Sequence, residues 1–130
     1  MTKKVILDAS AVLAFLQDET GSEKVDAVLS EGKAVISAVN YAEVVGKLLE
    51  AGLPEASAKV VMENLEFQIE PFDDKQAWKT GLLRMDSREF GLSLADRGCL
   101  ALAHIKNLPV ITADTHWDKL KTDIKIIQLR

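Results

Sequence analysis

The segment Val5-Ile6-Leu7-Asp8 constrains the fold more than any other, because a short run of branched apolar residues ends there in an acid. Such a run, bounded by polar residues, predicts a strand buried on both faces, here from about Lys4 to Asp8. Further strands are expected at residues 34–37, 110–112 and 124–127, with a half-buried strand at 67–70. Doubly buried strands occur mainly in parallel sheets covered by helices, so this segment favours an α/β protein.

Helical segments separate the predicted strands. Helices are expected over residues 9–16, 38–51, 73–89 and 94–107, together with a helix that ends at Gly32, one that starts near Pro54 and a short one at 116–120. Strands that alternate with helices imply right-handed crossovers and a mainly parallel sheet. We therefore expect the α/β class and a single domain over residues 1–130.

Composition narrows the class of function. The chain has 130 residues, a formal net charge of −4 and a single cysteine, Cys99. One cysteine excludes an internal disulfide and a cysteine-based zinc cluster. The acidic balance argues mildly against a protein that coats nucleic acid through overall positive charge. No apolar run is long enough to span a bilayer, and residues 1–4 lead into a strand rather than a secretory signal, so we expect a cytoplasmic protein without membrane contact.

Two aspartates directly follow predicted strands. Asp8 ends the first strand, and Asp114 follows residues 110–113, each just before a helix. Either residue would serve as a helix N-cap, which is the simplest interpretation. The carboxyl ends of parallel strands meet at one edge of the sheet, where ligands bind in such folds. Two aspartates at that edge therefore favour a shared site over coincidence.

Asp96 and Glu43 lie on predicted helices. Asp96 shares a helix face with apolar residues at i+3, i+4 and i+7. A capping box with Ser93 explains an acid in the first turn but does not explain its face, so a functional role is favoured. Glu43 lies opposite the apolar face of its helix, with Asn40 and Lys47, which favours a solvent-exposed glutamate. It reaches the strand-end edge only because it lies early in its helix.

Converging acids would restrict the chemistry of the site. Neighbouring carboxylates repel and raise one another's pKa unless a cation neutralises them. Oxygen ligands without a histidine or cysteine cluster favour Mg²⁺ or Mn²⁺ over Zn²⁺. Such an ion polarises a phosphoryl oxygen and lowers the pKa of bound water, so the matching reaction is phosphodiester hydrolysis.

Four acidic motifs, in chain order, carry a resemblance to a known family. They are VILDAS at residues 5–10, NYAEV at residues 40–44, SLADR at residues 93–97 and TAD at residues 112–114. Together they resemble the PIN-domain ribonucleases, of the kind found as VapC toxins in bacterial toxin–antitoxin pairs. The resemblance covers essentially the whole chain.

This resemblance implies a three-layer α/β/α sandwich around a five-stranded parallel sheet. It also implies Mg²⁺ or Mn²⁺ as cofactor, RNA as substrate, a homodimer, and inhibition by a VapB-type antitoxin. The catalytic and metal-binding acids that it implies are Asp8, Glu43, Asp96 and Asp114, so Glu43 is expected in the site despite its helix face. Asp118, one helical turn after Asp114, is either a further site acid or a solvent-exposed helix residue.

Other polar residues are candidates for substrate contact. Ser10 either binds a phosphate or caps the first helix, and both interpretations are equally good. Thr112 either contacts substrate or packs within its strand, with packing favoured. Arg97 either binds a phosphate or is simply solvated. Further basic side chains that would suit an RNA backbone, or the exposed face of any amphipathic helix, are Lys79, Arg84 and Arg88.

Two other functions are open at this point. A receiver-like signalling module also carries acids at strand ends, but it requires a pair of adjacent acids after the first strand, and Ala9 follows Asp8. A catalytically inert PIN-like module would only bind a partner protein. The presence of all four acids argues against a decayed site. The two tryptophans, Trp78 and Trp117, favour packing in the core or in a dimer interface over base stacking.

Overall fold

The computed structural model describes residues 3–130. Residues 1–4 are expected to lead into the first strand, and residues 1 and 2 of that segment lie outside the described residues. One five-stranded sheet runs through the centre of the molecule, in the order β3-β2-β1-β4-β5, and each of its pairings is parallel. The strands are β1 (Val5–Leu7), β2 (Ala34–Ser37), β3 (Gln68–Glu70), β4 (Val110–Thr112) and β5 (Ile126–Gln128). Their carboxyl ends therefore lie at one edge of the sheet.

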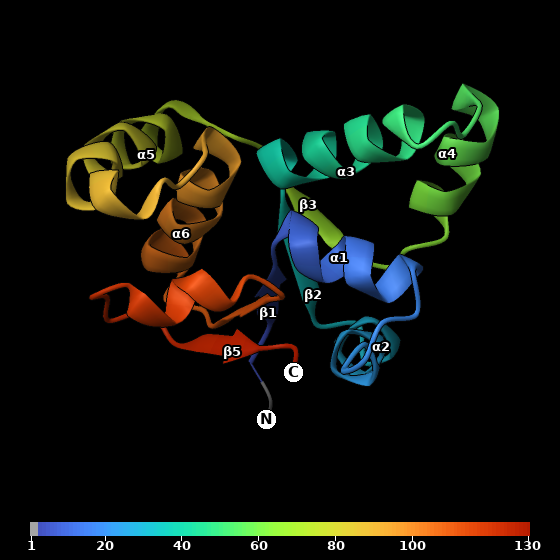
Figure 1. Ribbon diagram of the computed structural model, residues 1–130, viewed down its shortest axis with the longest axis horizontal. Helices are drawn as coiled ribbons and strands as arrows, with labels where there is room; N and C mark the ends of the chain where they lie inside the picture. Colours follow the sequence, from blue (N-terminus) through green and yellow to red (C-terminus); the bar gives the residue numbers. More distant parts are fainter. Residues whose placement is uncertain (1–2) are drawn as a thin grey trace.

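Helices connect the strands and cover both faces of the sheet. The first crossover contains α1 (Ala9–Leu16) and α2 (Glu23–Ser30), and the second contains α3 (Ala38–Glu50) and α4 (Glu55–Glu63). The third contains α5 (Asp74–Asp86), the 3₁₀ turn η1 (Arg88–Phe90) and α6 (Leu94–Lys106), and the 3₁₀ helix η2 (Thr115–Lys119) precedes β5. Helices α1 to α4 lie on one side of the sheet and α5 and α6 on the other (Figure 1). Among the helices of residues 3–130, none is long and apolar enough to cross a membrane.

The alternation of side chains along the strands produces two cores. On β1, Leu7 packs with α1 to α4, whereas Ile6 packs with α6 and η2, and both side chains are fully buried. On β2, Ile36 likewise packs in the first of these cores and Val35 in the second. Burying a branched side chain of this size contributes about 1.5–3 kcal/mol relative to exposure. Trp117 packs in the second core, which confirms its expected packing role. The predicted three-layer α/β/α arrangement is confirmed.

The edge strand β3 differs from the prediction. The expected half-buried alternation is wrong, because Ile69 is 44% exposed at the outer strand of the sheet. Phe67 lies just before the strand, packs against the first core, and meets Tyr41 edge to face with ring centroids 6.0 Å apart. At the opposite edge, β5 begins at Ile126, two residues later than expected.

Helix α5 is shorter than predicted, because its last turn is closed by a side chain. The Ser87 hydroxyl donates to the Leu83 carbonyl at 2.6 Å, and the helix ends at Asp86. The chain then makes the η1 turn and reverses at Gly91, which adopts a left-handed conformation with φ of 64°. This turn places the start of α6 at the carboxyl edge of the sheet.

Candidate active site

Asp8 is the most buried acid at this edge, with only 2% of its surface exposed. It follows β1 and caps α1, because its Oδ1 accepts a hydrogen bond from the Ala11 amide at 2.8 Å. The hydroxyls of Ser10 and Thr112 also donate to its carboxylate, at 2.8 and 2.6 Å. Burial raises the pKa of Asp8 to about 6, these hydrogen bonds act in the opposite direction, and the charge of Asp96 raises it further.

Ser10 and Thr112 join the ends of β1 and β4. The Ser10 oxygen accepts from the Ala113 amide at 2.9 Å, and the Thr112 oxygen accepts from the Asp114 amide at 3.1 Å. Each hydroxyl has one proton and donates it to Asp8, so the 3.2 Å contact between the two oxygens is not a further hydrogen bond. The helix cap expected at Ser10 is therefore wrong, since Asp8 provides it. Thr112 is fully buried, which favours a positioning role over substrate contact.

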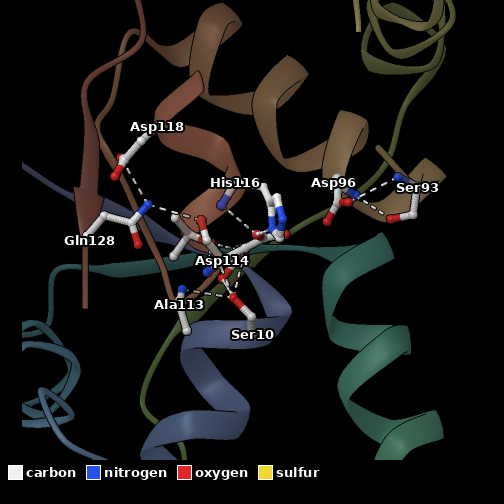
Figure 2. A network of polar contacts seen from close by, with 10 residues as sticks. Ser10, Ser93, Asp96, Ala113, Asp114, His116, Asp118 and Gln128 are labelled. Atoms are coloured by element: carbon white, nitrogen blue, oxygen red, sulfur yellow. Dashed lines mark hydrogen bonds and ion pairs between the residues drawn. The ribbon is translucent and has the colours of Figure 1, made fainter. Parts of the chain in front are cut away.

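Asp114 follows β4 and caps η2. Its Oδ1 accepts from the His116 amide at 2.9 Å and lies 3.1 Å from His116 Nδ1, while no hydrogen bond within residues 3–130 engages its Oδ2. His116 therefore lies beside the candidate site, although its isolated position in the sequence gives no signal for this. Asp118 is exposed and accepts from Gln128 Nε2 at 3.1 Å. It points toward Gln128, on the far side of Asp114 from Asp96 (Figure 2).

Asp96 forms the capping box that the sequence allows. Its amide donates to Ser93 Oγ at 3.1 Å, and its Oδ2 accepts from the Ser93 amide at 3.0 Å. The other oxygen, Oδ1, has no hydrogen-bond partner in the described part of the chain. The charge of Asp96 raises the pKa values of both Asp8 and Glu43, and such an effect requires short separations. Capping and membership of the site are therefore compatible for Asp96.

Glu43 is half-buried, so the solvent-exposed position predicted from its helix face is wrong. Burial is the largest cause that raises its pKa, the charge of Asp96 is the second, and Lys47 acts in the opposite direction. Glu43 on α3 and Asp8 at the start of α1 thus lie within electrostatic range of the same Asp96 carboxylate on α6. The charge of Asp96 on α6 therefore acts on acids from two other elements.

Asn40 is a site residue that sequence reasoning missed. The helix pattern places it on the solvated face of α3, yet only 1% of its surface is exposed. Its Oδ1 accepts from the Ala9 amide of α1 at 3.0 Å, and its Nδ2 donates to the Ala95 carbonyl of α6 at 3.0 Å. One amide side chain therefore joins the starts of the three helices that carry Glu43, Asp96 and the Asp8 cap. Both partners come from distant parts of the chain, so no local pattern indicates this role.

Basic side chains offset little of the charge of these acids, and Lys47 acts on Glu43 alone. The ion pairs within residues 3–130 include none of Asp8, Glu43 and Asp96. The candidate acids offer only oxygens as ligands, and the nearby Cys99 thiol is buried with its pKa raised well above its usual range. Unbalanced carboxylates with free oxygens are the ligands that hard divalent cations prefer.

The side chains do not form a complete metal-binding cluster in their present positions. No three acidic, histidine or cysteine side chains of the described residues converge closely enough to hold an ion. Asp96 and Asp114 each have one oxygen in a capping hydrogen bond and the other without a partner. Ser10, Asp114 and Asp96 lie around the N-terminal end of α1 (Figure 2). The chemistry of these oxygen ligands therefore fits a divalent cation, and binding one would require the side chains to move closer together.

The metal-free protein is expected to lose stability as pH rises from about 4 to about 6. Asp8 ionises near 3.8 in an unfolded chain but near 6 in the folded protein, so the folded state binds more protons between these values. Each pKa unit corresponds to about 1.4 kcal/mol, so this residue accounts for a loss of about 3 kcal/mol. Chemical denaturation in EDTA at a series of pH values measures this loss in the free energy of unfolding. Asp8→Asn is the control, because its side chain does not ionise in this range. An equal loss in both proteins would assign the change to another group.

Truncation of Asn40 should loosen the site. Asn40→Ala leaves the Ala9 amide and the Ala95 carbonyl without partners, and we expect a loss of about 2–4 kcal/mol in the free energy of unfolding. The pKa of Glu43, followed by NMR, should fall toward its usual value as α3 and α6 separate. Gln76→Ala is the matched control, because Gln76 is another buried amide that donates to a backbone carbonyl, that of Pro71. A Glu43 pKa that is unchanged in Asn40→Ala would contradict the positioning role.

Comparison with solved structures identifies proteins that share this fold. The solved structures that share the fold include VapBC from Salmonella typhimurium, 18% identical with a TM-score of 0.76 over 99% of this chain and 100% of that chain. VapBC-1 from nontypeable Haemophilus influenzae is 16% identical, with a TM-score of 0.74 over 96% and 97%. VapC20 from Mycobacterium tuberculosis, a sarcin-ricin loop cleaving toxin, is 12% identical, with a TM-score of 0.70 over 94% and 99%.

Comparison by sequence gives the family. No match was found among curated protein sequences. The model of the PIN domain family matches residues 5–122, a region that includes Asp8, Glu43, Asp96 and Asp114. Because this match covers most of the chain, the protein belongs to the PIN-domain family.

Proposed function

We propose that this protein is a metal-dependent endoribonuclease that hydrolyses RNA phosphodiester bonds. The observation that carries the proposal is the gathering of unbalanced acids at one edge of the sheet. The charge of Asp96 on α6 raises the pKa values of Asp8 and Glu43, which belong to two other elements, and Asp114 is joined to Asp8 through Thr112. Membership of the PIN-domain family supports a nuclease. The same family match argues against the receiver-like alternative.

In the proposed mechanism Asp8, Asp96 and Asp114 would hold Mg²⁺ or Mn²⁺. When bound, the ion lowers the pKa of a water molecule and polarises the scissile phosphoryl group. Ser10 and Thr112 fix the direction of the Asp8 carboxylate and favour its ionised form, because both donate hydrogen bonds to it. Glu43 completes the ligand set or orients the attacking water by accepting a hydrogen bond from it.

The cellular role that we propose is that of the toxin in a VapBC-type pair, inhibited by a VapB-type antitoxin. The support is the shared fold with proteins that were crystallised as VapBC complexes, including one bound to DNA. A homodimer is proposed as well. An apolar stripe at helical spacing on α5 supports a protein interface, because its side chains Trp78, Leu82 and Met85 are 73%, 50% and 66% exposed.

One experiment distinguishes the nuclease from an inert module that only binds a partner protein. Asp96→Asn should reduce Mg²⁺-dependent cleavage of total cellular RNA by about 100-fold or more, which is the range for loss of one catalytic group. Folding should be preserved, because asparagine also accepts the capping hydrogen bond from the Ser93 amide. Gel analysis of the RNA, with EDTA as the metal-free arm, measures cleavage, and circular dichroism measures folding.

Asp73→Asn is the matched control for this experiment. Asp73 also caps a helix, since its Oδ1 accepts from the Gln76 amide at 2.9 Å, but it belongs to α5 and not to the candidate site. Cleavage by Asp73→Asn should equal that of the wild type. Unchanged cleavage by Asp96→Asn, or an equal loss in both variants, would refute the assignment.

A further inference from the structure

A pocket lined by three arginines lies at the N-terminal end of α6. It has a volume of about 440 Å³, and its lining contains no acidic side chain. The residues that line it are Arg84, Ser87, Arg88, Gly91, Leu92 and Arg97. The protein as a whole has a net charge of −4, so this concentration of positive charge does not follow from composition. The nearby acids Asp86 and Glu89 line a neighbouring pocket instead.

Arg97 contributes a buried charge without a counter-ion. Only 8% of its surface is exposed, so the solvated position considered from the sequence is wrong. One terminal nitrogen, Nη1, donates to the Thr80 carbonyl at 3.1 Å, while Nε is buried without a hydrogen-bond partner. None of the ion pairs formed between residues 3 and 130 includes Arg97. A guanidinium stays charged at any ordinary pH, and leaving it buried and unpaired is costly, so the pocket is suited to an anion.

Arg84 and Arg88 also line the pocket. They are four residues apart, around the end of α5 and the η1 turn, and both are exposed. Neither belongs to an ion pair in the described part of the chain. Helix α5 lies beside α6 (Figure 1) and packs against it. The two exposed arginines line the same pocket as the buried Arg97.

We propose that this pocket binds a backbone phosphate of the RNA substrate; the inference rests on the proposed ribonuclease function and extends it. Guanidinium groups recognise phosphate oxygens in a two-pronged geometry, and several around one pocket suit a phosphate dianion or diester. The pocket and Asp96 share the N-terminal turn of α6, because Leu92 precedes the Ser93 cap and Arg97 directly follows Asp96. RNA carries a phosphate at each nucleotide, so the proposal places one phosphate of the strand at the acids and a further one in this pocket.

RNA binding without cleavage tests the proposal. Fluorescence anisotropy with a short labelled single-stranded RNA, in EDTA, compares wild type with the double variant Arg84→Gln, Arg88→Gln. Both residues are exposed, so folding should be unaffected. We expect the Kd to rise about tenfold or more, and the slope of log Kd against log salt to decrease by about 0.7 for each phosphate that the variant no longer neutralises. The matched control is Arg130→Gln, an exposed arginine that pairs with Glu19 outside the pocket.

A second measurement reports on Arg97 directly. Titration of wild-type protein with inorganic phosphate should shift the NMR signal of the Arg97 Nε–H group, and the shift should weaken in the double variant. Equal RNA affinity of wild type and double variant, or an equal loss in Arg130→Gln, would overturn the proposal. Weakened binding of polyglutamate with unchanged RNA binding would assign the pocket to an acidic protein segment and would also overturn it.

These outcomes are separate from those of the ribonuclease test. If Asp96→Asn still cleaves RNA while the double variant binds it weakly, the catalytic assignment fails and the phosphate pocket stands. If Asp96→Asn is inactive and the double variant binds RNA normally, the pocket alone fails.

Discussion

The fold of the site depends on one buried carboxylate. Asp8 lies where β1 ends, at 2% exposure and without a cationic partner in residues 3–130, which is unfavourable for a charge. Three donors offset part of that cost, namely the Ala11 amide and the hydroxyls of Ser10 and Thr112. Because these donors come from α1 and β4, the same contacts that stabilise the charge also join the two central strands at their carboxyl ends.

Around this carboxylate, neutral polar groups position further acids that repel it. Asn40 holds the starts of α1, α3 and α6 together through two backbone contacts. In the same arrangement the charge of Asp96 raises the pKa of Glu43. A protein under selection for stability alone has no need for such repulsion, whereas a site that recruits a cation does. The buried charge of Arg97, only one residue beyond Asp96, adds the opposite sign next to the same edge.

Much of this architecture could be predicted from the sequence, because it depends on local patterns. The apolar runs at Val5–Leu7, Ala34–Ser37 and Val110–Thr112 become buried parallel strands, and the two aspartates that follow β1 and β4 lie at one edge. The apolar helix face of Asp96 does not suit a solvated acid, and this pattern alone indicates a special role for the residue. The capping box that competes with this interpretation is present as well, so the two explanations do not exclude each other.

Prediction from the sequence failed where a polar side chain forms its hydrogen bonds with distant parts of the chain. A helix pattern treats a polar residue as solvated, but Asn40 and Arg97 are buried against backbone groups of other helices. Glu43 is half-buried for a related reason, since α6 lies close to the start of α3. At Ile69 the opposite occurs, because an apolar residue at the sheet edge has too little cover to be buried. Tertiary packing decides these positions, and local periodicity does not contain that information.

The central claim is that the acids at the carboxyl edge of the sheet form a cation site. Anomalous diffraction from crystals soaked in Mn²⁺ tests it most directly. The account predicts a manganese peak in contact with carboxylate oxygens of Asp8, Asp96 and Asp114, and disappearance of that peak in Asp96→Asn crystals. Absence of a peak there at saturating Mn²⁺, or a peak bound only by other residues, would contradict the account.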